Sequence, residues 1–184
     1  METDIYYPKR YDIIYRSGYV TGFLGILLFA LSYLFYNWAV FSLGISVFYL
    51  GSLISGMFLL VWKKEVKIFI LSCIILGIIF AFSYLLFFKN PEILIISMGF
   101  VLAGLAGLYG KEAHCFHFIE GWILMWSFPF LIFANLLLYG LGLQNNGSVH
   151  AIFSVIYLII MLLALSFLIK KLRQPLMQFC QNQD

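Results

Sequence analysis

One short stretch of the chain, Gly110–Trp122, carries most of the side chains that could do chemistry. Its ionisable and nucleophilic residues are Lys111, Glu112, His114, Cys115, His117 and Glu120. If the stretch is helical, His114, His117 and Glu120 share one face, within an arc of about 120° at roughly 100° per residue. Two imidazoles and a carboxylate are ligands that zinc or iron accepts. A metal site formed by these three residues is therefore one hypothesis.

The same stretch can instead be a structural connection at the membrane surface. Phe116, Phe118 and Trp122 are interspersed with the polar residues, and such aromatic side chains can enter lipid while charged ones stay in water. This interpretation needs no cofactor. An enzyme or redox role for Cys115 and the histidines is least favoured, because an activated thiol needs nearby cations and Lys111 is the only one in the surrounding sequence.

The composition shows what kind of fold must position this stretch. Of the 184 residues, 64% are hydrophobic and 10% are charged, and the mean hydropathy is +1.01. A soluble domain carries about 25% charged residues, and it could not bury this much apolar surface. The length accommodates several spans of about 20 residues and leaves no room for a separate soluble domain. We expect a single polytopic membrane domain, residues 1–184.

Six apolar runs reach or nearly reach the length of a transmembrane helix, the one single-segment structure that satisfies its own backbone in lipid. We therefore predict an all-α membrane protein with a six-helix transmembrane bundle. The predicted spans are residues 18–36, 38–62, 68–88, 93–109, 122–143 and 149–169. The fourth is the shortest and can gain length from Gly110 onward. Residues 1–16 are predicted to be an interfacial segment with a helix starting near Pro8, and residues 170–184 a cytoplasmic tail.

Basic residues are distributed very unevenly between the two sides of the predicted membrane domain. On one side lie 10 of the 11 lysines and arginines, and only Lys89 lies on the other. By the positive-inside rule, both termini and Gly110–Trp122 are cytoplasmic. The net charge of +3 is thus a topology signal and gives no reason to expect nucleic acid binding. Cys115 and Cys180 fall on the same reducing side, so we expect no disulfide.

The predicted spans contain few polar side chains. No acidic residue, lysine or arginine lies inside any of them, which argues against an ion-coupled transporter because such proteins keep ionisable groups at membrane depth. Asn135 is the one amide well inside a span, six residues after Pro129. It can bond to a neighbouring helix beside a proline kink or contact a solute. Gly104 and Gly107 belong to a stripe of small residues that predicts close helix packing or a pore wall.

Short matches between the two halves of the chain suggest an internal repeat. Gly18-Tyr19-Val20 is similar to Gly99-Phe100-Val101, and Trp38 and Trp122 each begin the next span. With three spans in each half, such a repeat would have inverted topology, a design found in transporters.

Two motifs resemble those of a known family. The first is Tyr15-Arg16-Ser17-Gly18, and the second is Lys111-Glu112-Ala113 followed by Cys115-Phe116 and Glu120. Their order and spacing are similar to the bacterial and cyanobacterial integral membrane family catalogued as domain of unknown function 2301. The resemblance extends from about Tyr11 to the last span and implies a protein of the bacterial plasma (inner) membrane.

This resemblance changes which residues of Gly110–Trp122 we expect to matter. The family pattern has an aromatic residue where this chain has His114, and usually a polar residue other than histidine near His117. The candidates it favours are therefore Lys111, Glu112, Cys115, Phe116 and Glu120. The family brings no activity with it.

Two classes of function follow from the sequence. The favoured class is a non-catalytic membrane scaffold or assembly factor that uses the cytoplasmic 110–122 segment to bind a membrane-protein partner or a second copy of the chain. The alternative is a transporter or channel for a small uncharged solute, built on the inverted repeat and the Pro129 and Asn135 region. Neither class requires a cofactor, and both place the chain in a lipid bilayer.

Overall fold

The computed structural model describes residues 9–35, 37–61, 64–88, 91–142 and 147–176. Within these ranges it contains six α-helices, all long and apolar enough to cross a membrane. They are α1 (Lys9–Phe35), α2 (Trp38–Met57), α3 (Lys64–Ser83), α4 (Pro91–Phe116), α5 (Ile119–Gly140) and α6 (Gly147–Arg173), with a π-helical turn, η1 (Tyr84–Phe88), after α3. The predicted all-α membrane bundle is confirmed.

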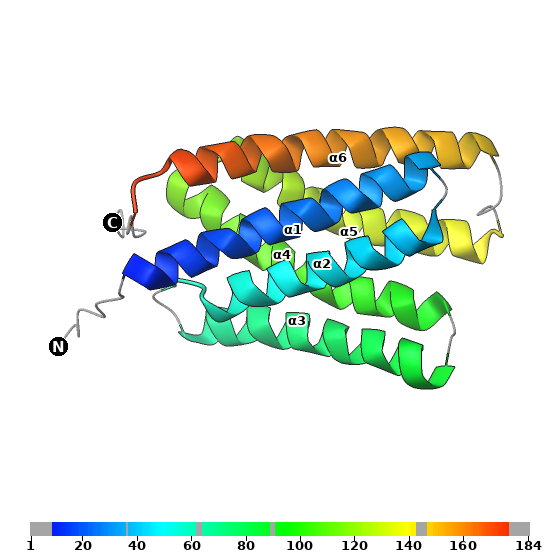
Figure 1. Ribbon diagram of the computed structural model, residues 1–184, viewed down its shortest axis with the longest axis horizontal. Coiled ribbons are helices and arrows are strands. Elements are labelled where there is room, and N and C mark those ends of the chain that lie inside the picture. Colours follow the sequence, from blue (N-terminus) through cyan, green and yellow to red (C-terminus); the bar gives the residue numbers. More distant parts are fainter. Residues whose placement is uncertain (1–8, 36, 62–63, 89–90, 143–146, 177–184) are drawn as a thin grey trace.

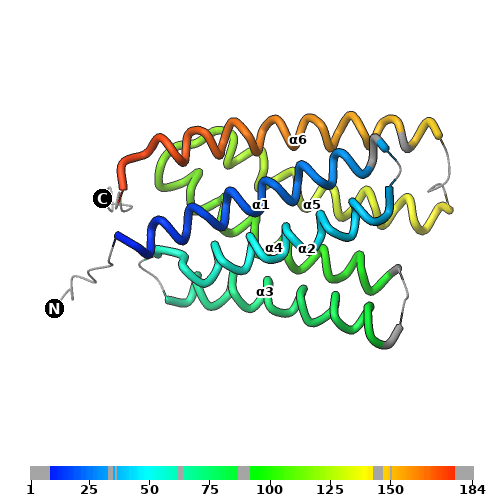
Figure 2. Tube along the Cα trace, in the orientation of Figure 1, coloured from blue at the N-terminus to red at the C-terminus, as the bar shows by residue number. Residues whose placement is uncertain are grey.

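The helices run up and down along one long axis, so that both ends of the described chain lie at the same end of the bundle (Figure 1). Neighbours in sequence pack together, most extensively α1 with α2, α3 with α4 and α4 with α5. The last helix returns to the first, and α1 lies between α6 and α2 (Figure 2). The arrangement therefore brings the start of α1 and the end of α6 close together.

The first and fourth helices differ most in length from the predicted spans. The first is one continuous helix from Lys9 to Phe35, so the described part of the predicted interfacial segment is continuous with the span. Tyr15 and Arg16 pack inside the bundle, and their placement at the headgroup level stays a prediction. The fourth helix extends past Gly110 to Phe116, as its short apolar run required.

Small residues allow two of the helix pairs to approach closely. A Cβ atom added to Gly25 would lie 2.5 Å from the backbone nitrogen of Phe48, which fixes how near α1 comes to α2. A Cβ atom on Gly104 would lie 2.7 Å from the Ile74 side chain and 3.0 Å from the Ile70 carbonyl oxygen, and one on Gly107 would lie 2.8 Å from the Ile70 side chain. In lipid such packing replaces the hydrophobic driving force. Gly104 and Gly107 therefore serve the contact between α4 and α3.

A buried polar contact joins three helices within the bundle. The Ser97 hydroxyl donates a 2.7 Å hydrogen bond to the Gly77 carbonyl oxygen, and the Tyr49 hydroxyl lies 2.7 Å from the same serine oxygen. Because the serine proton is used, Tyr49 is the donor in this second bond. The contact joins α2 and α3 to α4 at a fully buried serine.

Candidate functional site

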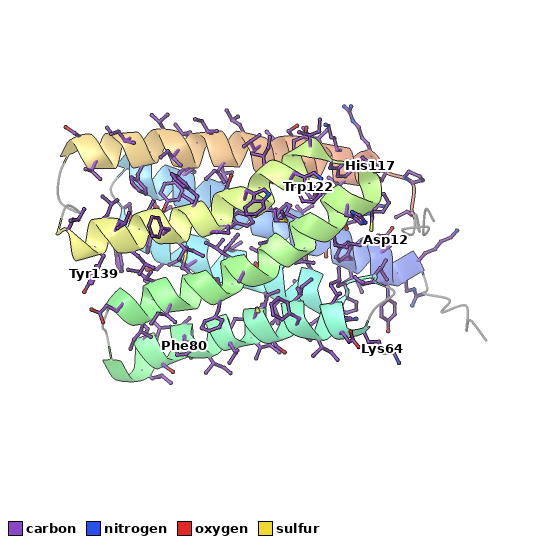
Figure 3. All side chains as sticks on the ribbon, turned by 180° about the vertical axis from the view of Figure 1, so that it is seen from behind. Asp12, Lys64, Phe80, His117, Trp122 and Tyr139 are labelled. Atoms are coloured by element: carbon purple, nitrogen blue, oxygen red, sulfur yellow. The ribbon has the colours of Figure 1, made fainter. Side chains whose placement is uncertain are left out.

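The Gly110–Trp122 stretch contains the reversal between α4 and α5. The first helix ends at Phe116, and the second begins at Ile119 after the extended residue Phe118. Between them His117 has a backbone φ of +54°, a conformation uncommon outside glycine. Figure 3 shows His117 at the same end of the bundle as Asp12 and Lys64, and Tyr139 at the opposite end.

This reversal removes the geometric basis of the histidine metal hypothesis. His114 belongs to α4 and Glu120 to α5, with His117 in the break between them, so the three residues do not share one helical face. Both histidines are exposed, and Glu120 pairs with Lys170 and accepts a 3.0 Å hydrogen bond from the Ser166 hydroxyl. Within the described residues, no group of three His, Cys, Asp or Glu side chains could hold a metal ion.

Glu112 lies at the centre of a buried cluster of charged and aromatic residues. Its side chain is fully buried and receives three hydrogen bonds. The Tyr15 hydroxyl donates to Oε1 at 2.6 Å, Lys111 Nζ donates to Oε1 at 2.9 Å, and Lys171 Nζ donates to Oε2 at 2.6 Å. These donors come from α1, α4 and α6, so a single carboxylate joins three helices.

The tyrosine contact extends as a directed chain toward the middle of the bundle. The hydroxyls of Tyr15 and Tyr19 lie 2.9 Å apart, and both residues are buried. Because Tyr15 gives its only hydroxyl proton to Glu112, Tyr19 must donate to Tyr15. The chain therefore runs from Tyr19 through Tyr15 to the carboxylate.

Two aromatic rings complete the surroundings of the lysines. Lys171 Nζ lies 4.7 Å from the centre of the Phe116 ring and 5.4 Å from that of Tyr15, and Lys111 Nζ lies 5.4 and 5.5 Å from the same two rings. Such cation–π contacts favour an ammonium group that has left water. Phe116 therefore stabilises the two lysines.

Arg16 links the start of α1 to the end of α6. Its guanidinium pairs with Asp12 at 3.0 Å and donates to three carbonyl oxygens, those of Lys171 at 3.1 Å, Gln174 at 2.7 Å and Pro175 at 2.8 Å. The last carbonyls of a helix lack partners within the helix, and the planar fork of an arginine can bond several of them at once. Arg16 thus caps α6.

We call these residues the charged network: Asp12, Tyr15, Arg16, Lys111, Glu112, Phe116 and Lys171. Its two acids and three cations leave one excess positive charge, and every charged member makes short contacts with the others or with backbone. Glu112 Oε1 accepts two hydrogen bonds and Oε2 accepts one, so three of the roughly four acceptor sites of the carboxylate are used inside the bundle. The network is therefore a structural fastening of α1, α4 and α6.

Cys115 also differs from its expectation. It is disulfide-bonded, whereas Cys73 is a buried free thiol. The expectation that no disulfide forms is therefore wrong at Cys115.

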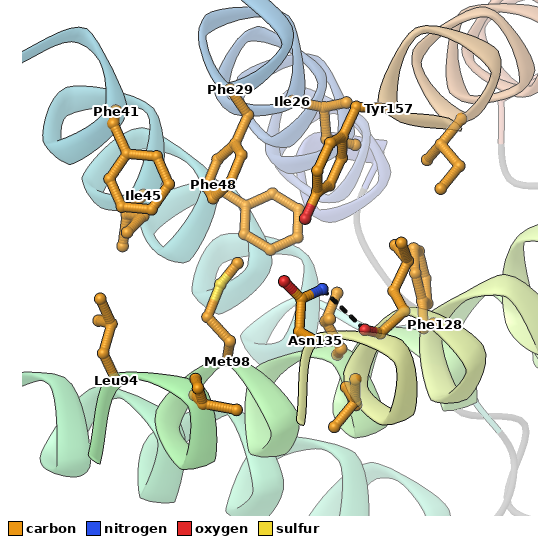
Figure 4. A pocket seen from close by; sticks show the side chains of 15 residues that line it. Ile26, Phe29, Phe41, Ile45, Phe48, Leu94, Met98, Phe128, Asn135 and Tyr157 are labelled. Atoms are coloured by element: carbon orange, nitrogen blue, oxygen red, sulfur yellow. Dashed lines mark hydrogen bonds between the residues drawn. The ribbon is translucent and has the colours of Figure 1, made fainter. Parts of the chain in front are cut away.

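A separate cavity of about 150 Å³ lies deeper in the bundle, toward the end opposite the charged network. It is bounded by five helices, and Figure 4 shows the side chains that surround it, which are apolar apart from the Asn135 amide and the Tyr157 hydroxyl. Its lining residues are Ile26, Phe29, Phe41, Ile45, Phe48, Leu94, Ile95, Met98, Leu102, Phe128, Leu131, Ile132, Asn135, Tyr157 and Ile160.

Asn135 supplies the amide in the cavity wall. Its Nδ2 donates a 2.8 Å hydrogen bond to the Leu131 carbonyl oxygen one turn earlier on the same helix. This bond turns Oδ1 toward the cavity (Figure 4). An amide oxygen can accept two hydrogen bonds, so Asn135 presents an acceptor to whatever occupies the space. Pro129 is exposed on α5 and does not line the cavity.

Packed aromatic rings separate the cavity from the charged network. Phe128, in the cavity wall, contacts Tyr109 at 5.6 Å between ring centres, and Tyr109 contacts Phe167 at 4.7 Å. Tyr19 also packs on Phe167, at 5.5 Å. All four residues are at most 7% exposed. We call Tyr19, Tyr109, Phe128 and Phe167 the aromatic plug.

Of the predicted site residues, the fold brings only some together. Lys111, Glu112 and Phe116 join the charged network, whereas His114 and His117 stay outside it. Asp12, Tyr15, Arg16 and Lys171 were missed as members of the charged network, although Tyr15-Arg16 and Lys111-Glu112 both occur in the motifs that resemble the family. That shared occurrence was the one signal in the sequence that could have linked them.

Six helices are long and apolar enough to cross a membrane, and the charged network links three of them at one end. These features define an integral membrane protein. A family model described as uncharacterized integral membrane protein (DUF2301) matches residues 56–178, more than half of the chain. The chain belongs to this family. The match includes the Lys111–Glu120 motif and lies after the Tyr15–Gly18 motif. No curated protein and no solved structure matches.

Proposed function

We propose that this protein binds a small uncharged molecule in the Asn135 cavity and carries it within the membrane. The observation that supports the proposal is an apolar space of about 150 Å³ with one amide oxygen turned into it. The chemistry of the site then sets the ligand: mostly apolar, and carrying one hydrogen-bond donor.

The size of the cavity favours a single ring. In another protein, a cavity of about 150 Å³ lined by Leu, Ile and Phe stays dry and binds benzene. The space in this protein has a similar volume, and most of its lining side chains are of the same types. A phenol-sized molecule, with a hydroxyl that donates to Asn135 Oδ1, satisfies both the apolar walls and the amide.

The geometry favours a carrier over an open channel. A channel needs a continuous path, but the aromatic plug closes the cavity toward the charged network, and Glu112, Lys111 and Lys171 fill the space beyond it. A solute can leave in that direction only if packed helices move, as in alternating access.

Binding can be tested with 4-fluorophenol and fluorobenzene, followed by fluorine NMR on the protein in lipid nanodiscs. We expect saturable binding of both, and loss of both when Ile160→Trp fills the cavity. Asn135→Leu should weaken 4-fluorophenol by about two- to tenfold, the net worth of one hydrogen bond, and leave fluorobenzene unchanged. Equal binding by wild-type protein and Ile160→Trp would contradict the proposal. Asn135→Leu is the control for folding, because a folded variant should still bind fluorobenzene like wild type.

We further propose that the charged end faces the cytoplasm of a bacterial cell, with the protein in the plasma (inner) membrane and both termini inside. The positive-inside rule supports this orientation, since 10 of the 11 basic residues lie on one side of the predicted spans. The disulfide at Cys115 opposes it, because cytosolic thiols are kept reduced. The orientation can be tested with a single cysteine at position 65 of a Cys-free variant, because Glu65 is exposed at the charged end. A membrane-impermeant thiol reagent should label it in opened cells and not in intact cells if this end faces the cytoplasm.

A scaffold that holds a membrane-protein partner or a second copy is the second candidate. Its specific support is the exposed side of the reversal, where His114 and His117 are exposed and Ile119 is 70% exposed. Lys111 and Glu112 are poor probes of this role because they are fastened inside the bundle. A His114→Ala/His117→Ala variant leaves the charged network intact. If it retains the same co-purifying proteins and the same oligomeric state as wild type, the scaffold role loses its support.

A further inference from the structure

A second hollow, of about 350 Å³, lies on the outer face of the bundle between α2 and α3. Several of its lining side chains are strongly exposed, including Trp38 at 63%, Phe82 at 59% and Leu85 at 65%. In a membrane-spanning chain, such apolar residues meet lipid. We call this hollow the lipid-facing groove.

The groove and the Asn135 cavity share a wall. Three residues, Phe41, Ile45 and Leu94, line both spaces. The Phe41 ring packs against Phe29 in the cavity and against Trp38 in the groove, with 4.8 Å between ring centres in each pair. One aromatic side chain thus stands between the two hollows and touches a ring on either side.

We propose that ligand enters the Asn135 cavity from the bilayer through the lipid-facing groove, with Phe41, Ile45 and Leu94 as the partition it must pass. This inference rests on the proposed function of the cavity. It adds the substrate class: a molecule that partitions into the membrane and reaches the protein from its side.

The side chains that line the groove suit the passage of an apolar ligand. The polar lining groups of the groove are two serines, two tyrosines and the indole N–H of Trp38, and the other lining side chains are apolar. The Ser46 hydroxyl donates to the Ser42 carbonyl oxygen at 3.0 Å, and the Tyr49 hydroxyl is bonded to Ser97, so two of these groups already have partners within the protein. Entry from the charged end would instead require passage through the aromatic plug.

A small movement is enough to open the partition formed by Phe41, Ile45 and Leu94. Phe41 is only half-buried, and rotation of its ring away from Phe29 would join the two spaces without moving a helix. Side-chain rotations are fast compared with collective helix motions, which take microseconds to milliseconds. Exchange of ligand between lipid and cavity should therefore need no helix motion, and its rate should depend on the bulk of the side chains along this route.

The test is a bulky side chain in the groove that leaves the cavity untouched. Ser46→Phe fits because Ser46 lines the groove and not the cavity. Ser127→Phe is a matched control: it too donates to the carbonyl oxygen of the residue four positions earlier, but on the outer face of α5. The readout is exchange of 4-fluorophenol in nanodiscs, measured by fluorine saturation transfer.

We expect Ser46→Phe to slow association and dissociation alike, by about tenfold or more, with the dissociation constant unchanged. Ser127→Phe should exchange like wild type, and Phe41→Ala should exchange faster. Wild-type exchange rates in both Ser46→Phe and Phe41→Ala, with saturable binding intact, would overturn entry through the groove while leaving the cavity proposal standing. An absence of saturable binding in wild type would overturn both.

Discussion

Glu112 in α4 accepts a 2.6 Å hydrogen bond from Lys171 in α6, 59 residues further along the chain. Both side chains are almost completely buried, at 0% and 4% exposure. Buried charge pairs lose much of their attraction to desolvation, but breaking one leaves an unpaired charge in an apolar place. The pair therefore adds little net stability. It favours the native arrangement of α4 and α6 because any other arrangement would leave a buried charge unpaired.

Replacing Glu112 with Gln should strongly destabilise the protein. The change leaves Lys111 and Lys171 without their shared carboxylate, and loss of one buried partner costs about 3–5 kcal/mol. Unfolding in mixed detergent micelles, followed by circular dichroism, measures the effect. The control is Glu65→Gln, because Glu65 is exposed in the first turn of α3. Adding Lys171→Met to Glu112→Gln should restore part of the loss; if it adds a further full penalty, the two residues are not coupled.

The two tyrosines of the directed chain should differ in importance. Tyr15→Phe removes a hydrogen bond to a charged group, worth about 1.5–3 kcal/mol, whereas Tyr19→Phe removes a bond between neutral groups, worth about 0.5–1.5 kcal/mol. Tyr15→Phe also leaves the buried Tyr19 hydroxyl without its acceptor. The same unfolding measurement compares the two variants. They are matched because each removes one hydroxyl from a buried tyrosine. A larger loss for Tyr19→Phe than for Tyr15→Phe would contradict this ranking of the two hydrogen bonds.

The outline of this fold was predictable because apolar run length determines it. Each span needs enough apolar residues to cross the bilayer, and the shortest predicted run, residues 93–109, extends into the polar motif to do so. Local chemistry did not identify the other charged members of the network around Glu112. Asp12, Arg16 and Lys171 look like solvated or headgroup residues in sequence, and only the return of α6 to α1 buries them.

The predicted inverted repeat illustrates a second limit of sequence patterns. Gly18 and Gly99 are matched in sequence, but their surroundings differ: a Cβ atom on Gly18 would lie 2.6 Å from the Ser55 backbone nitrogen, whereas one on Gly99 would lie 3.9 Å from Ile132. Small residues permit close packing without specifying which neighbour uses it. The repeat stays a prediction.

Gly104→Ala should weaken the contact between α4 and α3. The added methyl group would lie 3.0 Å from the Ile70 carbonyl oxygen and closer still to the Ile74 side chain, and overpacking of this kind costs about 1–3 kcal/mol. Gly22→Ala is the control, since its methyl group meets no atom within 4 Å. Thermal unfolding in detergent should place Gly104→Ala below wild type and Gly22→Ala at or above it; the reverse order would contradict the packing role.

Arg16→Lys should loosen the end of α6 even though the charge is kept. The guanidinium of Arg16 bonds the carbonyl oxygens of Lys171, Gln174 and Pro175 while pairing with Asp12, and a lysine ammonium cannot reproduce that planar fork. We expect faster hydrogen exchange in residues 168–173, with exchange in the middle of α6 unchanged. Arg173→Lys is the matched control, because Arg173 is exposed in the last turn of the same helix. If both variants exchange like wild type, backbone capping by Arg16 is not what holds this end of α6 against α1.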